Sequence, residues 1–224
     1  MRTHPVFLRL AGRPCVVVGG DAAAALRAVA CVRAGARVTV VTAAPGPEMT
    51  ALVARGDVRH QARGWHPGDL RGAFLAYAST RDPELIGWLA AEAERERVLL
   101  NVIDVPEACT FVSAAVVERG ELQVAIGTGG ASPGLSARLR RELETHVGPE
   151  YAAFVAILGA VRRALAADPG RAGARGEVVA RLLDSPLLEL VRAGRRAEID
   201  ALLAREAGDG ITLERLGVAL GEAA

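Results

Sequence analysis

Short apolar runs alternate with longer alanine- and leucine-rich stretches along the first hundred residues of the chain. The apolar runs have the length of buried strands, and the stretches between them are long enough for helices. Strands are predicted over 15–18, 38–41, 57–62, 73–79 and 98–103, and helices over 22–34, 46–55 and 83–96. Alternation of this kind predicts an α/β fold whose parallel sheet carries helices on both faces.

The pattern changes after residue 104. Two β-rich runs fill 110–130 and are joined at Glu118-Arg119-Gly120, which predicts a hairpin. A helix is expected from Ser132 to about His146. The remainder is predicted to be helical, with an apolar stripe formed by Phe154, Leu158, Val161 and Leu165. The chain therefore divides into an α/β domain over 1–112, a β-rich section over 113–148 and a helical domain over 149–224.

Composition narrows the class of protein without naming a function. The chain of 224 residues is 51% hydrophobic and 24% charged, as in a soluble globular protein. Lysine and arginine total 27 against 26 acidic residues, which gives no reason to expect nucleic-acid binding. No apolar run reaches the ~18–20 residues of a membrane span, and no signal peptide is recognisable. The cysteines form no CxxC pair and no disulfide is expected, so a cytoplasmic location is predicted.

The first predicted strand ends in a glycine turn. Residues 15–41 read as strand, tight turn at Gly19-Gly20, helix and second strand. This is the βαβ opening of a Rossmann-type, doubly wound fold that binds dinucleotides. The fingerprint departs from the usual spacing, since it runs Gly19-x-Asp21-x-x-Ala24. No acidic residue follows the second strand to hold a ribose hydroxyl, so residues 15–41 leave dinucleotide binding open.

Asp21 allows two interpretations. It is a favourable cap for the alanine-rich helix that follows. Its charge would also repel a phosphate, by roughly 3 kcal/mol at ~5 Å in an effective dielectric of ~20 and by less than about 1 kcal/mol if water screens it. The two effects are compatible, and the direction of the side chain decides the second.

Asp104 is the other chemically informative residue. It follows the fifth predicted strand, at the sheet edge where open α/β folds bind ligands. One interpretation is a simple turn before Val105-Pro106. The other is a carboxylate in a cleft that exchanges a proton or meets a cation. The histidines show no metal-ligand spacing, and no metal site is predicted; they are His4, His60, His66 and His146.

Two longer segments carry a family resemblance. "NVIDVPEACTF" (101–111) and "TGGASPGLSARLRRELE" (128–144), together with "PVFLRLAGRPCVVVGG" (5–20), resemble the sirohaem-synthesis dehydrogenases. These are the stand-alone precorrin-2 dehydrogenases and the amino-terminal half of sirohaem synthase. The resemblance implies NAD-dependent oxidation of precorrin-2 to sirohydrochlorin, and in some members insertion of ferrous iron as a second substrate. It also implies a homodimer, with 113–148 as the dimerisation section.

The resemblance assigns roles to individual residues. Asp104 corresponds to the family's catalytic aspartate. The residues expected to bind NAD are Gly19, Gly20, Asp21, Ala22, Ala23, Ala43, Ala44 and Thr80. Those expected to bind the tetrapyrrole are Thr128, Gly130 and Ser132.

Two alternatives remain open. The first is a tetrapyrrole chelatase or binding protein whose NAD site is impaired by Asp21. The second is a regulatory nucleotide-sensing domain. It accounts for the βαβ opening but leaves 128–144 and the helical tail unexplained.

Overall fold

The computed structural model describes residues 2–220. Their contacts form two compact units. The first unit contains the residues up to Ser113 together with Gly129–Ala131, and the second contains Ala114–Thr128 and the residues from Ser132 onward. The division of the chain into three parts stays a prediction, because the β-rich section and the helical part fall largely into one unit.

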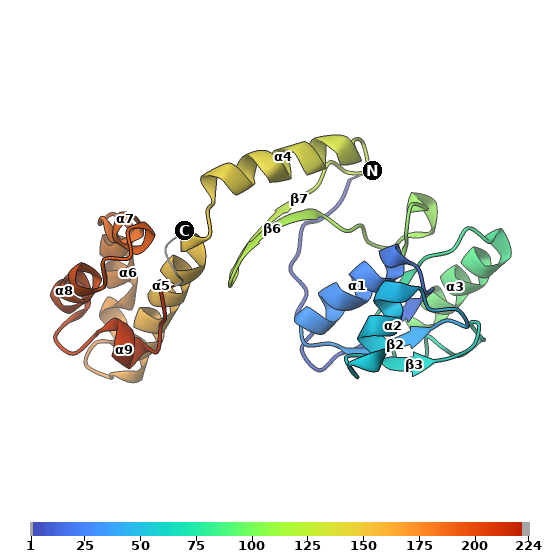
Figure 1. Ribbon diagram of the computed structural model, residues 1–224, viewed down its shortest axis with the longest axis horizontal. Coiled ribbons are helices and arrows are strands. Elements are labelled where there is room, and N and C mark those ends of the chain that lie inside the picture. Colours follow the sequence, from blue (N-terminus) through green and yellow to red (C-terminus); the bar gives the residue numbers. More distant parts are fainter. Residues whose placement is uncertain (1, 221–224) are drawn as a thin grey trace. The chain divides into compact units, whose positions relative to one another are not determined.

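The first unit is built on a five-stranded parallel sheet (Figure 1). Its strands are β1 (Pro14–Val18), β2 (Arg37–Val41), β3 (Arg59–Gln61), β4 (Leu75–Ala78) and β5 (Leu99–Val102). They lie in the order β3-β2-β1-β4-β5, so the chain builds outward from β1 first on one side and then on the other. The strand order reverses between β1 and β4, which is the position where open α/β folds bind their ligands.

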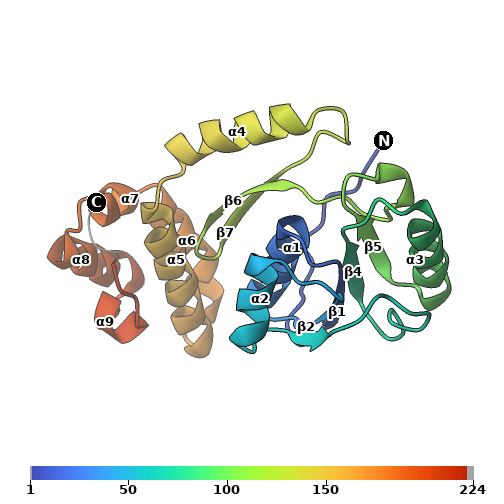
Figure 2. The same cartoon turned by 45° about the vertical axis from the view of Figure 1, so that its right-hand side comes forward.

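Helices cover both faces of this sheet (Figure 2). They are α1 (Ala22–Arg33), α2 (Pro47–Ala54) and α3 (Pro83–Glu96). Alternate residues of β1 point to opposite faces of the sheet. Cys15 and Val17 pack in the core shared with α1 and α2, whereas Val16 and Val18 pack in the core shared with α3. The predicted doubly wound sheet is therefore confirmed; β1 and β2 each start one residue earlier than predicted, and β3, β4 and β5 are shorter at both ends.

The second unit joins a hairpin to a set of helices. The hairpin consists of β6 (Ala115–Arg119) and β7 (Leu122–Ile126). The helices are α4 (Pro133–His146), α5 (Glu150–Ala167), α6 (Arg175–Leu183), α7 (Leu187–Arg192), α8 (Arg196–Ala207) and α9 (Leu213–Leu216), and short 3-10 turns cover Pro106–Ala108 in the first unit and Ala172–Ala174 in the second. Fully buried side chains from α5, α6 and α8, among them Ile157, Leu182 and Leu203, form its core.

Two details of the second unit differ from the sequence prediction. The hairpin turn is Gly120-Glu121, since Arg119 pairs with Leu122. Glu118 and Arg119 thus lie inside β6, and the turn starts at the glycine because Gly120 takes a φ of +58°. On α5, Ile157 is fully buried, while Leu158 is only partly buried at the margin of the core. Among the described residues, none of the helices has the length and apolar character that a membrane span requires.

Candidate dinucleotide turn and substrate cavity

The glycine turn after β1 is packed tightly against two neighbouring loops. Gly19 has a φ of +119°, and a Cβ atom there would lie 2.9 Å from the carbonyl oxygen of Ser79. A Cβ atom on Gly20 would overlap the carbonyl oxygen of Ala44. The amide of Gly46 donates a 2.8 Å hydrogen bond to the carbonyl of Gly20. Glycine is therefore required at both positions by protein packing alone.

Asp21 caps α1. Its Oδ1 accepts a 2.8 Å hydrogen bond from the amide of Ala24, and its Oδ2 accepts a 2.6 Å hydrogen bond from the Ser79 hydroxyl. The Ser79 hydroxyl, followed by the Ala24 amide, lowers the pKa of the Asp21 carboxyl below its ordinary value. The carboxylate thus accepts the hydrogen bond of a backbone amide at a helix N-terminus, and such amides are the donors that bind phosphate groups in this fold.

The second predicted nucleotide segment lies beside this turn. Thr42 is buried at the end of β2, and its Oγ1 accepts a 3.3 Å hydrogen bond from the amide of Ala44. Thr80 follows Ser79 in the loop after β4, where its Oγ1 accepts a 3.1 Å hydrogen bond from the amide of Asp82. The structure therefore brings the loops after β1, β2 and β4 together at one edge of the sheet.

Asp104 lies two residues beyond the end of β5. It takes a φ of +60°, a left-handed conformation that aspartate tolerates better than most residues do. Its Oδ2 accepts a 2.8 Å hydrogen bond from Nη2 of Arg81, and the two side chains are 69% and 71% exposed. Asp104 thus forms the turn after β5 and also lines a cavity, and its part in proton exchange or cation binding stays a prediction.

That cavity belongs to the first unit and has a volume of about 460 Å³. Its lining comes from the end of β5 and the turn after it, from α1, and from the segments around 112 and 130. The lining residues are Arg27, Asn101–Pro106, Cys109, Val112, Ser113 and Gly129–Ala131. Apolar side chains and backbone form most of this wall, and Arg27 and Asp104 are its charged members among the described residues.

The predicted tetrapyrrole-binding residues separate in the structure. Gly130 lines the cavity with Asp104. Thr128 and Ser132 belong to the second unit, where the Thr128 hydroxyl donates to the Ser132 carbonyl at 3.1 Å and accepts from the Ser132 amide at 3.2 Å. The Ser132 hydroxyl accepts a 3.2 Å hydrogen bond from the Leu135 amide and so caps α4. Both side chains thus shape the start of α4, and their contact with a substrate stays a prediction.

Sequence reasoning missed Ser79, Arg81 and Arg27. Ser79 and Arg81 follow β4, which neighbours both β1 and β5, so their position beside Asp21 and Asp104 depends on strand order. Arg27 lies on α1 six residues after Asp21, and nothing in the local pattern points it to β5. The available signal was the general rule that polar residues following parallel strands converge at one sheet edge.

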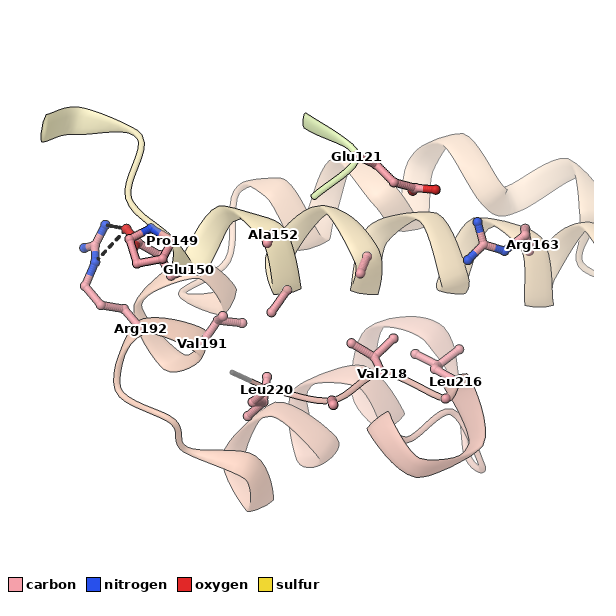
Figure 3. A pocket seen from close by; sticks show the side chains of 14 residues that line it. Glu121, Pro149, Glu150, Ala152, Arg163, Val191, Arg192, Leu216, Val218 and Leu220 are labelled. Atoms are coloured by element: carbon pink, nitrogen blue, oxygen red, sulfur yellow. Dashed lines mark hydrogen bonds and ion pairs between the residues drawn. The ribbon is translucent and has the colours of Figure 1, made fainter. Parts of the chain in front are cut away.

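Among residues 2–220, no set of three or more histidine, cysteine, aspartate and glutamate side chains is arranged to hold a metal ion. A second cavity of about 550 Å³ lies in the second unit, between α5 and the segment after α9 (Figure 3). Its wall carries small and apolar residues and the Glu150–Arg192 ion pair, whose atoms lie 2.7 Å apart. None of the predicted site residues lies there.

A five-stranded parallel sheet with a glycine turn after β1 and a cavity after β5 defines a Rossmann-type protein of the dinucleotide-binding class. Two family models match the chain, one described as "Putative NAD(P)-binding" over residues 6–115 and one as "Sirohaem biosynthesis protein central" over residues 119–146. The chain therefore matches the NAD(P)-binding and central regions of the sirohaem biosynthesis proteins, the resemblance that its sequence motifs predicted.

Individual relatives agree with this family. A siroheme synthase from Methylobacillus flagellatus is 38% identical over 74% of this chain and 35% of its own length. One from Thioalkalivibrio sulfidiphilus is 37% identical over 87% of this chain and 40% of its own length. The chain thus spans less than half the length of these relatives. The solved structure of SirC, a precorrin-2 dehydrogenase, superposes with a TM-score of 0.73 over 91% of this chain and 98% of its own, at 23% identity, and shows a common fold.

Proposed function

We propose that the chain oxidises precorrin-2 to sirohydrochlorin with NAD as the oxidant. The observation that carries the proposal is the cavity after β5, which holds the Asp104 carboxylate on the unit that matches the NAD(P)-binding family model. The reaction removes one hydride and one proton from the reduced macrocycle, so NAD becomes NADH and one proton is released.

The sheet edge fits a dinucleotide. The loops after β1, β2 and β4 converge there, and the residues that would hold NAD are Gly19–Ala23, Ala43, Ala44 and Thr80. The negative charge of Asp21 opposes a phosphate, but the Ala24 amide and the Ser79 hydroxyl partly compensate it. Residues 42–48 contain no basic side chain for a 2′-phosphate, which favours NAD over NADP. When bound, NAD supplies the hydride acceptor.

Asp104 is the proposed base. Its carboxylate lines the cavity and accepts the proton that leaves the macrocycle. Arg81 holds Oδ2 of this carboxylate at 2.8 Å and so limits the directions that the side chain can take. The side chain is well exposed, so water can carry the proton away from it.

We also propose that the active form is a homodimer assembled through the section over 113–148. The observation behind this is the two-stranded sheet β6–β7, whose outer edges leave backbone groups unpaired unless another chain covers them. The free thiols Cys15, Cys31 and Cys109 support a reducing, cytoplasmic environment.

The test is an anaerobic assay of precorrin-2 with NAD, followed by the absorbance of NADH. Asp104→Asn keeps a residue that tolerates the left-handed backbone, and we expect it to lower turnover by about 10²- to 10⁴-fold, the usual contribution of a general base. Asp57→Asn is the matched control, because Asp57 is also ion-paired with an arginine, Arg55, at 2.7 Å. Its turnover should equal that of the wild type. Full turnover in Asp104→Asn would remove this residue from the mechanism.

A second candidate function follows from the Asp21 hydrogen bonds. If the capped carboxylate excludes NAD, the chain would bind sirohydrochlorin and insert ferrous iron as its substrate, without oxidising precorrin-2. NAD titration of the wild type by calorimetry distinguishes the two. Heat of binding supports the dehydrogenase, whereas its absence together with sirohydrochlorin binding supports the chelatase or tetrapyrrole-binding protein.

A further inference from the structure

We propose that Arg27 is the residue that binds a carboxylate of the tetrapyrrole in the cavity after β5, and that it determines specificity for acidic macrocycles. The inference rests on the proposed function and names one contact within it. It assigns no part in proton or hydride transfer to Arg27.

The charges of the cavity wall point to this role. Arg27 and Asp104 are its charged members among the described residues, and they have opposite signs. The Asp104 carboxylate is held by Arg81. Arg27 forms no ion pair within the described part of the chain, so its guanidinium keeps its hydrogen-bond donors for an anion. A guanidinium presents paired N–H groups in the spacing of a carboxylate.

Arg27 is also held in place. Its Cζ lies 5.6 Å from the centre of the Tyr77 ring, within the range of a cation–π contact. Tyr77 is fixed in turn by an edge-on contact with Phe111, at 5.4 Å between ring centres, and by a 3.4 Å hydrogen bond between its hydroxyl and that of Ser113. Burial raises the pKa of Tyr77, so the ring stays a neutral platform at physiological pH. A guanidinium stacked in this way loses little conformational freedom when it binds an anion.

The substrate class matches the cavity. The macrocycle of the proposed reaction carries a carboxylate on each of its side arms, and most of the cavity wall is apolar. The flat apolar ring edge can therefore contact Ile103 and Val112 while one acid arm reaches Arg27. A phosphate of the dinucleotide is the competing anion, because α1 also begins at the glycine turn. Separate titrations of the two ligands distinguish these partners.

The experiment compares Arg27→Met, Arg27→Lys and the control Arg37→Met. Methionine keeps the stem packed over Tyr77 and removes the charge, while lysine keeps the charge and loses the paired donors. Arg37→Met changes the net charge by the same amount, but Arg37 is exposed at the start of β2, at the amino ends of the strands and away from the cavity. Sirohydrochlorin and its fully methyl-esterified form are titrated by absorbance without NAD, and NAD is titrated separately by calorimetry. Thermal unfolding confirms that each variant is folded.

We expect Arg27→Met to weaken sirohydrochlorin binding by about ten- to a hundredfold, the usual range for a lost hydrogen bond to a charged group. Arg27→Lys should lie between Arg27→Met and the wild type, and Arg37→Met should bind like the wild type. The ester should bind wild type and Arg27→Met equally, and all variants should bind NAD alike. Unchanged sirohydrochlorin affinity in Arg27→Met, or a loss confined to NAD, would overturn the inference and leave the proposed function standing. If the wild type itself binds no sirohydrochlorin, both fail.

Discussion

A single carboxylate decides how readily the first turn of α1 receives an anion. Asp21 already supplies an acceptor for the Ala24 amide and for the Ser79 hydroxyl. A phosphate that approaches this turn meets a negative charge instead of a free amide. Because the side chain is exposed, water screens most of that repulsion, and its cost is nearer 1 kcal/mol than the unscreened figure of about 3 kcal/mol.

Asp21→Asn tests this cost. Asparagine is an equally good cap, so stability at pH 7 should change by less than about 1 kcal/mol, while NAD should bind about three- to tenfold more tightly. The pKa of Asp21 is lower in the folded state than in the unfolded state, where it is about 3.9. The ionised carboxylate therefore stabilises the folded state at pH values above about 3.9, and this stabilisation is lost as the pH falls through the folded-state pKa. Asp21→Asn has no carboxyl group at this position, so its free energy of unfolding should not show this loss at low pH. Calorimetric NAD titration and urea unfolding at pH 3 and 7 measure both effects.

Asp82→Asn is the matched control, because Asp82 caps α3 in the same way. It should leave NAD affinity unchanged. Equal NAD affinity in Asp21→Asn and the wild type would show that the carboxylate lies out of reach of the phosphates.

At the level of elements, local sequence signals were sufficient for most of the fold. The apolar runs predicted all the strands of the parallel sheet, and Ser132 began its helix as predicted. The predicted hairpin turn began two residues too early, at Glu118, because the strand propensity of Val116 and Val117 says nothing about where Gly120 reverses the chain. The Asp104 position was predictable from its place after a strand. Its partner Arg81 was not, since 23 residues separate them and only strand order brings them together.

The hairpin turn makes a close contact with α5, and this contact yields a prediction. A Cβ atom on Gly120 would lie 3.2 Å from Cβ of Ala152, in a left-handed backbone conformation. Gly120→Ala should therefore lower the free energy of unfolding by about 2 kcal/mol, of which about 1 kcal/mol is backbone strain. Gly194 also has a left-handed backbone, but no atom lies within 4 Å of its added Cβ. Gly194→Ala should therefore lower the free energy of unfolding only by the strain contribution of about 1 kcal/mol. Urea denaturation compares the two; equal losses would show that Ala152 yields freely.

At the scale of the whole molecule, the chain carries separate hydrophobic cores. The second unit is centred on residues of α5, α6 and α8, and the two faces of the parallel sheet have their own cores. The proposed NAD-binding residues belong to the first unit. Damage to the helical core should therefore reduce stability without altering the chemistry at the sheet edge.

Leu203→Ala tests this separation. Leu203 is fully buried on α8, and its truncation should cost about 2–5 kcal/mol in the free energy of unfolding of the second unit. NAD affinity at 25 °C should stay at the wild-type value. The control Leu183→Ala removes a side chain that is 55% exposed and should change stability by less than about 0.5 kcal/mol. Differential scanning calorimetry with and without NAD reports both quantities, and a matching fall in NAD affinity would contradict the separation.

The left-handed backbone at Asp104 has a consequence for how this chain can be altered. Glycine would relieve the local strain there at no steric cost. A search for thermostable variants that selects only on melting temperature would therefore favour glycine at this position and discard the proposed base. Selection for the proposed activity would therefore retain aspartate at residue 104, whereas laboratory selection for heat resistance would replace it.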